Sequence, residues 1–347
     1  MRIAQIAPLM EPVPPEKYGG TERVVSYLVD GLIARGHEVT LFASGDSQTE
    51  ADLVAATRSA LRPAQKDKEM LAPHIRELGM AFERAAEFDV IHSHVDYLAF
   101  PVARLSPTPS LHTLHGRLDL PQLPQVFREF DELPLVSISD AQREPFRDLH
   151  LNWAGTVYHG LPVDRYPYSS EAGSYLLFVG RMSPEKGPAL AIAVAKRANL
   201  PLKIAAKVDR TEREYFEAEI RPLLADAHIE FLGEVDEEQK RVLMASALAL
   251  IFPIDWPEPF GLVMIEAMAT GTPVVARRRG SVPEIIMPGR TGFVGETIDD
   301  LVDGVRRVHT IDRAACRADV EARFSVSTMA ANYETLYERL LEQPRAA

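Results

Sequence analysis

Short apolar runs alternate with longer amphipathic stretches along most of the chain. The runs are a few residues long and are bounded by glycine, proline or polar residues, a pattern typical of strands buried on both faces of a sheet. The stretches between them have helical spacing. Strands and helices that alternate in this way predict parallel sheets with helices on both faces. The predicted strands are Ile3–Ala7, Val39–Ala43, Val90–His94, Ser110–His115, Leu135–Ser139, Thr156–Tyr158, Leu176–Val179, Leu202–Lys207, Ile229–Leu232, Leu248–Phe252 and Pro273–Ala276.

The alternation stops once and then restarts, and this divides the chain into two predicted domains. Leu161–Ser174 contains two prolines and several small polar residues, so it is interpreted as a linker. We therefore predict one domain over residues 1–165 and another over 166–324, both of ordinary domain size. The tail, 325–347, has apolar residues at helical spacing and is predicted to form a last helix. The polar stretch 49–70 is predicted to be a loop with a short helix.

Composition narrows the class of protein. The 347 residues are 46% hydrophobic and 25% charged, as in an ordinary soluble protein. The net charge of −12 argues against a nucleic-acid partner, so an anionic ligand must be captured by a local cluster of cations. No apolar run approaches the ~20 residues of a membrane span, and the first residues do not resemble a signal peptide. The single Cys316 excludes an intramolecular disulfide, and we predict a cytoplasmic protein.

The most informative motif is a pair of glutamates, Glu258 and Glu266, near the predicted start of a helix. Three prolines exclude a helix before Phe260, and Gly271 ends it. Glu258 then lies just ahead of the helix, where the free backbone N–H groups of residues 260–263 can bind an anion. Glu266 is expected about two turns inside the helix. The motif thus combines an anion site with two carboxylates.

The two glutamates have two other interpretations. A carboxylate pair for glycoside hydrolysis needs its oxygens roughly 5–10 Å apart, whereas eight helical residues rise about 12 Å. Glu258 and Glu266 are better suited to opposite ends of a long ligand such as a nucleotide-sugar. The alternative is a capping carboxylate and a solvated residue on the helix face. Glu266 lies in an otherwise apolar stretch, however, so its charge requires a partner.

A second motif follows the apolar strand at Leu176–Val179. The strand ends in Gly180-Arg181, and Lys186-Gly187 opens an alanine-rich helix after a tight turn. Ligands of open parallel sheets bind beyond the carboxyl ends of strands, where these two cations must lie. An arginine and a lysine suit a diphosphate, although two solvated surface cations are the simpler alternative.

A third motif lies near the N-terminus. Gly19-Gly20 follows the first strand and a proline-rich loop, and it allows a backbone to approach a ligand closely. Thr21 is predicted to cap the helix that runs to about Arg35. A dinucleotide-binding or P-loop site is not favoured, because neither G-x-G-x-x-G nor G-x-x-x-x-G-K-[ST] occurs.

Together these motifs resemble those of the retaining glycosyltransferases of family 4, and the resemblance covers nearly the whole chain. The segments Tyr18–Val24 and Arg35–Leu41 fit it as well. It implies an α/β protein with the GT-B fold, in which two Rossmann-like, doubly wound parallel-sheet domains face a central cleft. The first domain would bind the acceptor and the second the donor, and the last helix would cross back to the first domain.

The resemblance also implies an activity. The expected enzyme moves a hexose from a UDP- or GDP-hexose to an unidentified small-molecule, glycan or lipid-linked acceptor. It retains the anomeric configuration and needs no metal and no cofactor. Two departures put the acceptor and the donor sugar in doubt: His159 stands where the family usually has Asn, and residues 254–257 replace a commoner serine-containing approach to Glu258. A nucleotide-sugar epimerase and a non-catalytic nucleotide-sugar binding protein remain as alternatives.

Roles for single residues follow from the same resemblance. Arg181, Lys186 and the helix N-terminus would hold the diphosphate, Glu258 the donor sugar and Glu266 the ribose. His115 would lie beside the donor sugar, and backbone groups around Glu234 and Val235 would read the base. The predicted catalytic residues are Glu258, His115, Arg181 and Lys186; the donor-binding residues are Gly19, Gly20, Arg181, Lys186, Lys207, Glu234, Val235, Glu258, Phe260, Gly261, Leu262, Val263 and Glu266; the acceptor-side residues are His94 and Ser139.

Some of these residues have simpler interpretations. Four histidines near strand ends, His92, His94, His112 and His115, raise the question of a metal site, but no carboxylate or cysteine pattern accompanies them. Hydrogen-bonded histidines are therefore favoured. Ser139 is equally suited to cap a helix, and Lys207 to end a strand in solvent. The run 277–279, three arginines, is interpreted as a solvated loop.

Overall fold

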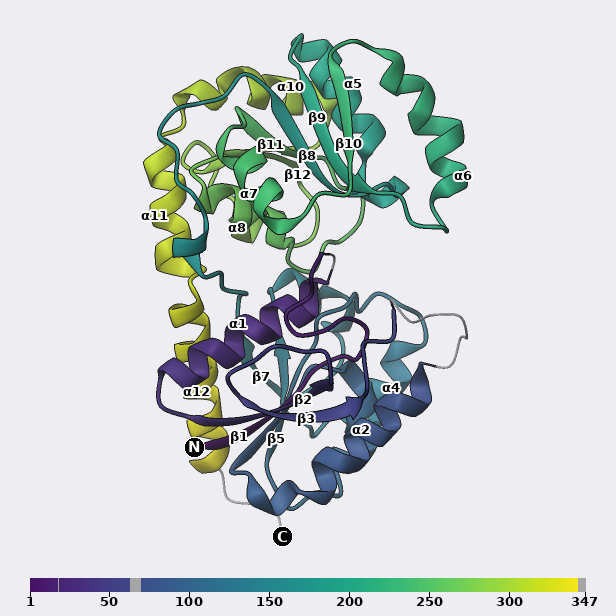
Figure 1. Cartoon of the computed structure of the whole chain (residues 1–347), viewed down its shortest axis with the longest axis vertical. Helices are drawn as coiled ribbons and strands as arrows, with labels where there is room; N and C mark the ends of the chain where they lie inside the picture. Colours follow the sequence, from purple (N-terminus) through teal and green to yellow (C-terminus); the bar gives the residue numbers. More distant parts are fainter. Residues whose placement is uncertain (18, 63–69, 343–347) are drawn as a thin grey trace. The chain divides into compact units, whose positions relative to one another are not determined.

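The computed structural model describes residues 1–17, 19–62 and 70–342 (Figure 1). These residues form two compact α/β units. The first comprises Met1–Leu161 and the last helix, α12 (Val326–Glu342), and the second comprises Pro162–Ser325. Each unit contains one sheet, and all pairs of neighbouring strands described in the two sheets are parallel. The predicted fold class, two doubly wound parallel-sheet domains, is therefore confirmed.

The sheet of the first unit has seven strands in the order β3-β2-β1-β4-β5-β6-β7. Successive strands are added to one side of β1 and then, from β4 onward, to the other side. The winding direction thus reverses between β1 and β4. The strands are β1 (Arg2–Ile6), β2 (Glu38–Ser44), β3 (Asp52–Thr57), β4 (Val90–Ser93), β5 (Ser110–Thr113), β6 (Leu135–Ser137) and β7 (Trp153–Thr156).

Helices cover this sheet and carry the chain between its strands (Figure 1). The last helix, α12, packs against α1 and buries Tyr333 and Tyr337 within the unit. Glu334 of α12 also accepts a hydrogen bond from His37 Nε2 at 2.9 Å. The helices are α1 (Gly20–Ala34), α2 (Leu71–Glu83), α3 (Phe100–Ala103), α4 (Leu123–Glu129) and α12, with 3₁₀ turns η1 (Ala85–Glu87), η2 (Asp96–Ala99) and η3 (Ala141–Phe146).

The sheet of the second unit has six strands in the order β10-β9-β8-β11-β12-β13. Here the winding direction reverses between β8 and β11. The strands are β8 (Leu176–Arg181), β9 (Leu202–Lys207), β10 (Ile229–Gly233), β11 (Ala249–Phe252), β12 (Val274–Arg277) and β13 (Gly292–Gly295). The helices are α5 (Pro188–Ala198), α6 (Arg213–Tyr215), α7 (Glu237–Ala245), α8 (Leu262–Ala269), α9 (Val282–Ile285), α10 (Ile298–Arg307) and α11 (Arg313–Arg323), with shorter turns η4 (Val163–Arg165), η5 (Pro184–Lys186), η6 (Phe216–Ile220), η7 (Arg221–Ala225) and η8 (Val308–Thr310).

Two strands were not predicted, and both lie at sheet edges. β3 falls in the stretch 49–70, where a loop and a short helix were predicted, and residues 63–69 of that stretch lie outside the described residues. β3 and β13 each pair with one neighbour only. The apolar run of β3, residues 53–56, lies within a stretch that is polar on the whole, and β13 has only two apolar side chains between its glycines. The predicted strand at 156–158 is also shifted, because β7 ends at Thr156.

Helix starts follow local chemistry in some places and not in others. Asp236 and Thr297 each form a capping box with the third residue of the following helix. The predicted cap at Thr21 is wrong, because α1 already begins at Gly20 and its N-cap residue is Gly19. The backbone alone therefore starts α1, and Thr21 is left free to line a cavity described below.

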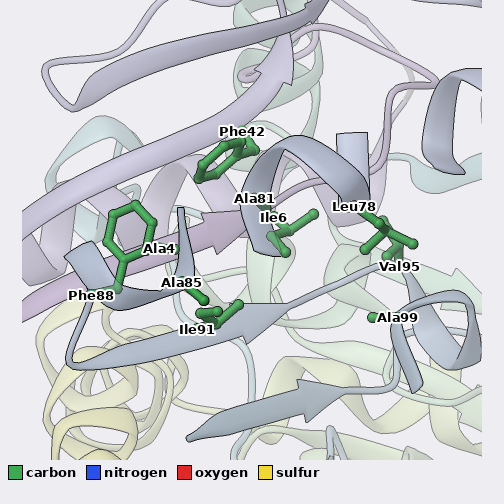
Figure 2. Close-up of a cluster of buried hydrophobic side chains, with 10 residues drawn as sticks. All are labelled: Ala4, Ile6, Phe42, Leu78, Ala81, Ala85, Phe88, Ile91, Val95 and Ala99. Atoms are coloured by element: carbon green, nitrogen blue, oxygen red, sulfur yellow. The ribbon is translucent and has the colours of Figure 1, made fainter. Parts of the chain in front are cut away.

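Part of the core of the first unit lies between α2 and the sheet (Figure 2). Phe42 of β2 meets Phe88 edge to face, with ring centroids 6.1 Å apart, and the Arg84 guanidinium lies over both rings. Each fully buried side chain of this size contributes roughly 1.5–3 kcal/mol. Two small residues, Ala81 of α2 and Ala85 just beyond the end of the helix, allow α2 to lie close to β1 and β4.

Glu77 is the exception on the buried face of α2. The residue is fully buried, and neither carboxyl oxygen has a hydrogen-bond partner among the described residues. Burial raises the pKa of the Glu77 carboxyl well above its usual value, so the folded state holds the neutral form. The unfolded chain ionises at its ordinary pKa. Glu77 therefore costs stability at any pH above that value.

Replacing Glu77 with glutamine should raise the stability of the protein at pH 7. Below the unfolded pKa of about 4.3, the Glu77 carboxyl is neutral in both the folded and the unfolded state. Above that pH only the unfolded state ionises, so the free energy of unfolding falls until the pH reaches the raised folded pKa. We expect Glu77→Gln to gain about 1–3 kcal/mol at pH 7 and nothing at pH 4, measured by urea unfolding. The exposed Glu83→Gln on the same helix is the control. Equal gains at both pH values would contradict this explanation.

Candidate functional site

In the second unit, the candidate residues lie on the loops that follow β8 and β11, the two strands between which the winding direction reverses. Arg181 is the last residue of β8, and Glu258 lies in the loop between β11 and α8. Loops at such a reversal leave the sheet on opposite sides, and the crevice between them is the usual ligand site of open α/β sheets. The two strongest motifs of the sequence thus meet at this point.

Lys186 and Glu258 are in direct contact. The ammonium group donates to Glu258 Oε2, which also accepts from Trp256 Nε1 at 3.0 Å, and it lies 4.8 Å from the centre of the Trp256 ring. The turn that brings Lys186 here requires glycine at Gly187. Its φ is 72°, and a Cβ would lie 2.3 Å from the Pro253 carbonyl oxygen. The lysine motif is therefore locked against the loop that carries Glu258.

The loop of Glu258 is also held from the other side, by residues that the sequence motifs did not include. A Cβ on Gly280 would lie 2.3 Å from the Glu258 carbonyl oxygen, so only glycine fits at this position. Ser281 N donates to that same carbonyl at 3.0 Å, and Ser281 Oγ donates to the Phe260 carbonyl at 2.7 Å. The Gly-Ser pair after the predicted strand at 273–276 was the available signal.

Glu266 has the partner that its burial requires. The residue is 3% exposed, and its Oε1 accepts from Lys240 Nζ at 2.8 Å and from the Tyr166 hydroxyl at 3.3 Å. Lys240 was not singled out in the sequence, since it lies on α7 rather than in the motif. It also contacts Glu237 at 2.8 Å, so one ammonium group serves two carboxylates.

The helix after Glu258 starts later than predicted. α8 begins at Leu262, and Gly261, its N-cap residue, adopts a left-handed conformation with φ 81°. Glu266 is consequently only the fifth helical residue, just over one turn inside, and the 12 Å helical rise assumed between the two glutamates does not apply. Met264 N donates to the Gly261 carbonyl at 3.0 Å. The amides of Leu262 and Val263 remain as the N-terminal donors of this helix.

The other predicted cations of this unit contact acidic side chains. Arg181 donates to Glu185 at 3.0 Å and to Glu212 at 3.3 Å, and Lys207 lies 3.0 Å from Asp209. Glu234 is exposed and Val235 is half-buried between β10 and α7. The arginines 277–279 form ion pairs with Asp255 and Glu296 at the surface.

In the first unit, a cavity of about 260 Å³ lies at the corresponding reversal, between β1 and β4. It brings together the segment after β1, the start of α1, the end of β4 and the end of β5. His94 and His115 both line it. The lining residues are Pro8, Thr21, His74, His94, Val95, Asp96, Leu98, His115 and Gly116.

Asp96 is the acidic residue of this cavity, and the sequence motifs missed it. Its backbone has φ 48°, an unfavourable conformation for a residue with a side chain. Its Oδ1 accepts from the His115 backbone N–H at 3.3 Å. Loss of solvation raises the pKa of the Asp96 carboxyl to about 6, against the opposing effect of backbone hydrogen bonds from His115 and Gly116. The sequence signal that could have identified Asp96 is a carboxyl two residues after His92-Ser93-His94, at the end of a strand.

The histidines contact one another and other polar groups. His115 Nε2 lies 2.8 Å from His94 Nδ1, and the His115 ring stacks on His159 with centroids 5.3 Å apart. Burial lowers the pKa of His115 to about 3, so the ring is neutral at pH 7. His112 is buried against Phe100 and bonded to Ser110. No group of three or more His, Cys, Asp or Glu among the described residues is arranged to hold a metal ion.

Ser139 precedes Asp140, the N-cap residue of η3. It is fully buried, and its Oγ accepts from Gln142 N at 3.1 Å at the start of η3. The Gln142 side chain donates to the carbonyls of Leu114 and Gly116 at 2.9 and 2.8 Å, on either side of His115. Gln142 is thus a further residue that the sequence did not reveal, and it fixes the loop that carries His115.

No helix formed by the described ranges, 1–17, 19–62 and 70–342, is both long and apolar enough to cross a bilayer.

Comparisons with known proteins agree with this arrangement. The family model described as Glycosyltransferase Family 4 matches residues 18–158, and the one described as Glycosyl transferases group 1 matches residues 168–322. A phosphatidyl-myo-inositol mannosyltransferase of Mycobacterium leprae is 27% identical and covers 97% of this chain and 96% of its own length.

Solved structures extend the comparison. A glycosyltransferase involved in avilamycin A biosynthesis is 26% identical, with a TM-score of 0.74 over 99% of this chain and 98% of its own. Anabaena HepE, solved in complex with UDP-glucose, is 18% identical, with a TM-score of 0.72 over 97% of this chain and 100% of its own. The matches cover both units, and the chain belongs to glycosyltransferase family 4, with the GT-B fold.

Proposed function

We propose that the chain transfers a hexose from a nucleoside-diphosphate hexose to an acceptor hydroxyl and retains the anomeric configuration. The observation that carries this proposal is the presence of two lysine–glutamate contacts in the second unit, Lys186 with Glu258 and Lys240 with Glu266. A nucleotide-sugar offers anionic phosphates and neutral hydroxyls. The site supplies cations for the first and carboxylates for the second.

The diphosphate would be held by Arg181, Lys186 and the N-terminal amides of α8. An ammonium group has three donors, so Lys186 can keep Glu258 and still donate to a phosphate oxygen. Arg181 has five N–H donors and two acidic partners, which leaves donors for the ligand. In the reaction the bond from sugar C1 to the phosphate oxygen breaks. The same cations then stabilise the negative charge of the departing diphosphate.

Each glutamate would bind hydroxyls at a different part of the donor. Glu258 lies beside Lys186 and is assigned to the sugar. Glu266 lies on α8 and faces Lys240 of α7, and it is assigned to the ribose, with the base near Glu234 and Val235. Lys240 Nζ donates to the buried Glu266 at 2.8 Å, and a carboxylate is a strong hydrogen-bond acceptor for a ribose hydroxyl.

The cavity of the first unit is proposed as the acceptor side. It offers the Asp96 carboxyl and the neutral ring of His94 to the acceptor, and the neutral ring of His115 to the donor sugar. These groups are suited to hydroxyls rather than to anions. The new bond joins sugar C1 to the acceptor oxygen, and the acceptor proton passes to the leaving diphosphate. This front-face scheme needs no protein nucleophile and no metal. The roles of Gly19, Gly20, Ser139 and Lys207 stay predictions.

The names of relatives support a nucleotide-sugar donor but leave the sugar and the acceptor open. The Mycobacterium leprae relative is a mannosyltransferase with a lipid in its name, whereas structures of HepE hold UDP and UDP-glucose. We therefore propose a UDP- or GDP-hexose donor and a small-molecule, glycan or lipid-linked acceptor. A thermal-shift panel of nucleotides and nucleotide-sugars identifies the base before the acceptor is sought.

The reaction itself is tested with the donor so identified. Release of the nucleoside diphosphate should depend on an added acceptor, and proton NMR of the product should show the anomeric configuration of the donor. EDTA should leave the rate largely unchanged. Inversion of the anomeric centre would contradict retention, and loss of activity that Mn²⁺ restores would contradict the metal-free scheme. Epimerised donor with its nucleotide intact would identify an epimerase, and binding without turnover a binding protein.

Arg181 and Lys186 should each contribute to the affinity for the nucleoside diphosphate. Arg181→Ala and Lys186→Ala are expected to weaken nucleoside-diphosphate binding roughly 10- to 150-fold, the value of one charge-assisted hydrogen bond. Isothermal titration calorimetry measures this directly. Lys196→Ala is the matched control, because Lys196 lies in the last turn of α5 and pairs with Asp226 at the surface. Unchanged affinity in both variants would remove the diphosphate assignment.

The two glutamates should separate binding from turnover. Glu266→Gln is expected to weaken the nucleotide itself, whereas Glu258→Gln should spare the free nucleotide and lower kcat, since its partner is the sugar that changes in the transition state. Nucleotide affinity and kcat are measured for both variants. Glu237→Gln is the control, because it removes the other carboxylate of Lys240 without touching Glu266. The opposite result would reverse the proposed orientation of the donor.

A further inference from the structure

A continuous series of hydrogen-bonded side chains runs through the first unit, from the cavity to the tyrosines of α12. Its members come from β1, the ends of β4 and β5, and α12, and all except His115 are at least 97% buried. We call it the histidine–tyrosine network. In order, its members are His115, His94, Gln5, Tyr337, His92, Thr113 and Tyr333.

Gln5 stands at the centre of this network. It lies on β1 between Leu41 of β2 and His92 of β4, and it is completely buried. Its Nε2 donates to the Tyr337 hydroxyl at 3.1 Å, and its Oε1 accepts from His94 Nε2 at 2.8 Å. An amide is a donor at one end and an acceptor at the other, so its orientation gives the whole network a direction.

The direction on the His94 side determines where the protons lie. Because His94 Nε2 donates to Gln5, it must carry a hydrogen. Burial lowers the pKa of His94 well below its usual value, so the ring is neutral and its Nδ1 can only accept. The donor of the 2.8 Å contact is then His115 Nε2. His115 is neutral as well, and its Nδ1 is left with a lone pair.

The other half of the network fits the same direction. Tyr337 accepts from Gln5 and donates to His92 Nδ1 at 2.7 Å, and His92 Nε2 donates to Thr113 at 2.7 Å. Each hydrogen bond of the network then has one proton between its two heavy atoms. Reversing the amide would place a hydrogen on His115 Nδ1, an atom that is covered from solvent and has no partner among the described residues. An unpaired buried N–H is rarer in native structures than an unpaired acceptor.

We infer that Gln5 is a positioning residue that fixes the tautomer of His115, with the proton on Nε2 and the lone pair on the covered Nδ1. The tautomer does not rest on the proposed function. The unpartnered Nδ1 is thereby explained as an unpaired acceptor, which costs less than an unpaired N–H would.

The test is NMR of protein labelled with ¹⁵N in its histidine rings. Long-range proton–nitrogen correlation distinguishes protonated from unprotonated ring nitrogens, and the His115 signals are assigned by their loss in His115→Asn. We expect His115 to carry its proton on Nε2 in the wild-type protein. A proton on Nδ1 would overturn the inference without any variant. This spectrum is independent of turnover, so a failure of the proposed function remains distinguishable.

Gln5→Met should allow His115 to adopt both tautomers. The variant removes the Gln5 oxygen that holds the proton on His94 Nε2, and the His94 tautomer fixes that of His115. Both His115 nitrogen signals should then move toward average values. Gln5→Leu repeats the measurement if the first variant does not fold. Ser137→Ala, a buried polar position on β6 in the same sheet, is the control. Unaltered His115 signals in a folded Gln5 variant would also overturn the inference.

Discussion

Each sheet adds its strands outward in two opposite directions from a central pair, and the position of both candidate regions follows from this constraint. The loops after β8 and β11 leave the second sheet on opposite sides, as do those after β1 and β4 in the first. Between such loops no helix covers the strand ends. Side chains that would otherwise be buried under a crossing helix are then within reach of a ligand, while the sheet below holds them rigidly.

Placing charged groups at these points requires local compensation. Glu266 is nearly inaccessible to solvent and Glu258 is 9% exposed, and a buried unpaired carboxylate would cost several kcal/mol. The lysines that compensate them come from other elements, α7 for Glu266 and the turn after β8 for Glu258. A ligand that brings phosphates and hydroxyls to these pairs meets groups that are already held in place. The cost of their desolvation has been met in folding.

The first unit solves a related problem without charge. Its buried polar groups form the histidine–tyrosine network, in which neutral rings and hydroxyls satisfy one another. The pKa values of His92 and His94 are lowered well below the usual value by burial, which keeps the network uncharged. Because Tyr333 and Tyr337 belong to α12, the last helix of the chain completes a network that begins on β1.

Much of the fold was accessible from local patterns. Apolar runs between glycines and prolines located the central strands, because such strands are buried on both faces and their whole sequence shows it. Edge strands β3 and β13 escaped, since a strand with one neighbour needs little hydrophobic signal. Helix starts were predicted less accurately. The sequence favoured a cap at Thr21 and a start at Phe260, whereas the N-cap residues of α1 and α8 are Gly19 and Gly261.

The sequence by itself determined the fold class, the family and the motifs that follow β8 and β11, because residues close along the chain carry those signals. It also required that Glu266 have a partner. Only the tertiary structure decided that the partner is Lys240, that Asp96 lies in the cavity, and that Gln5 gives the histidines a direction. These contacts join residues far apart in the chain. Their geometry depends on how the strands pair, and no local pattern of hydrophobic and polar positions encodes it.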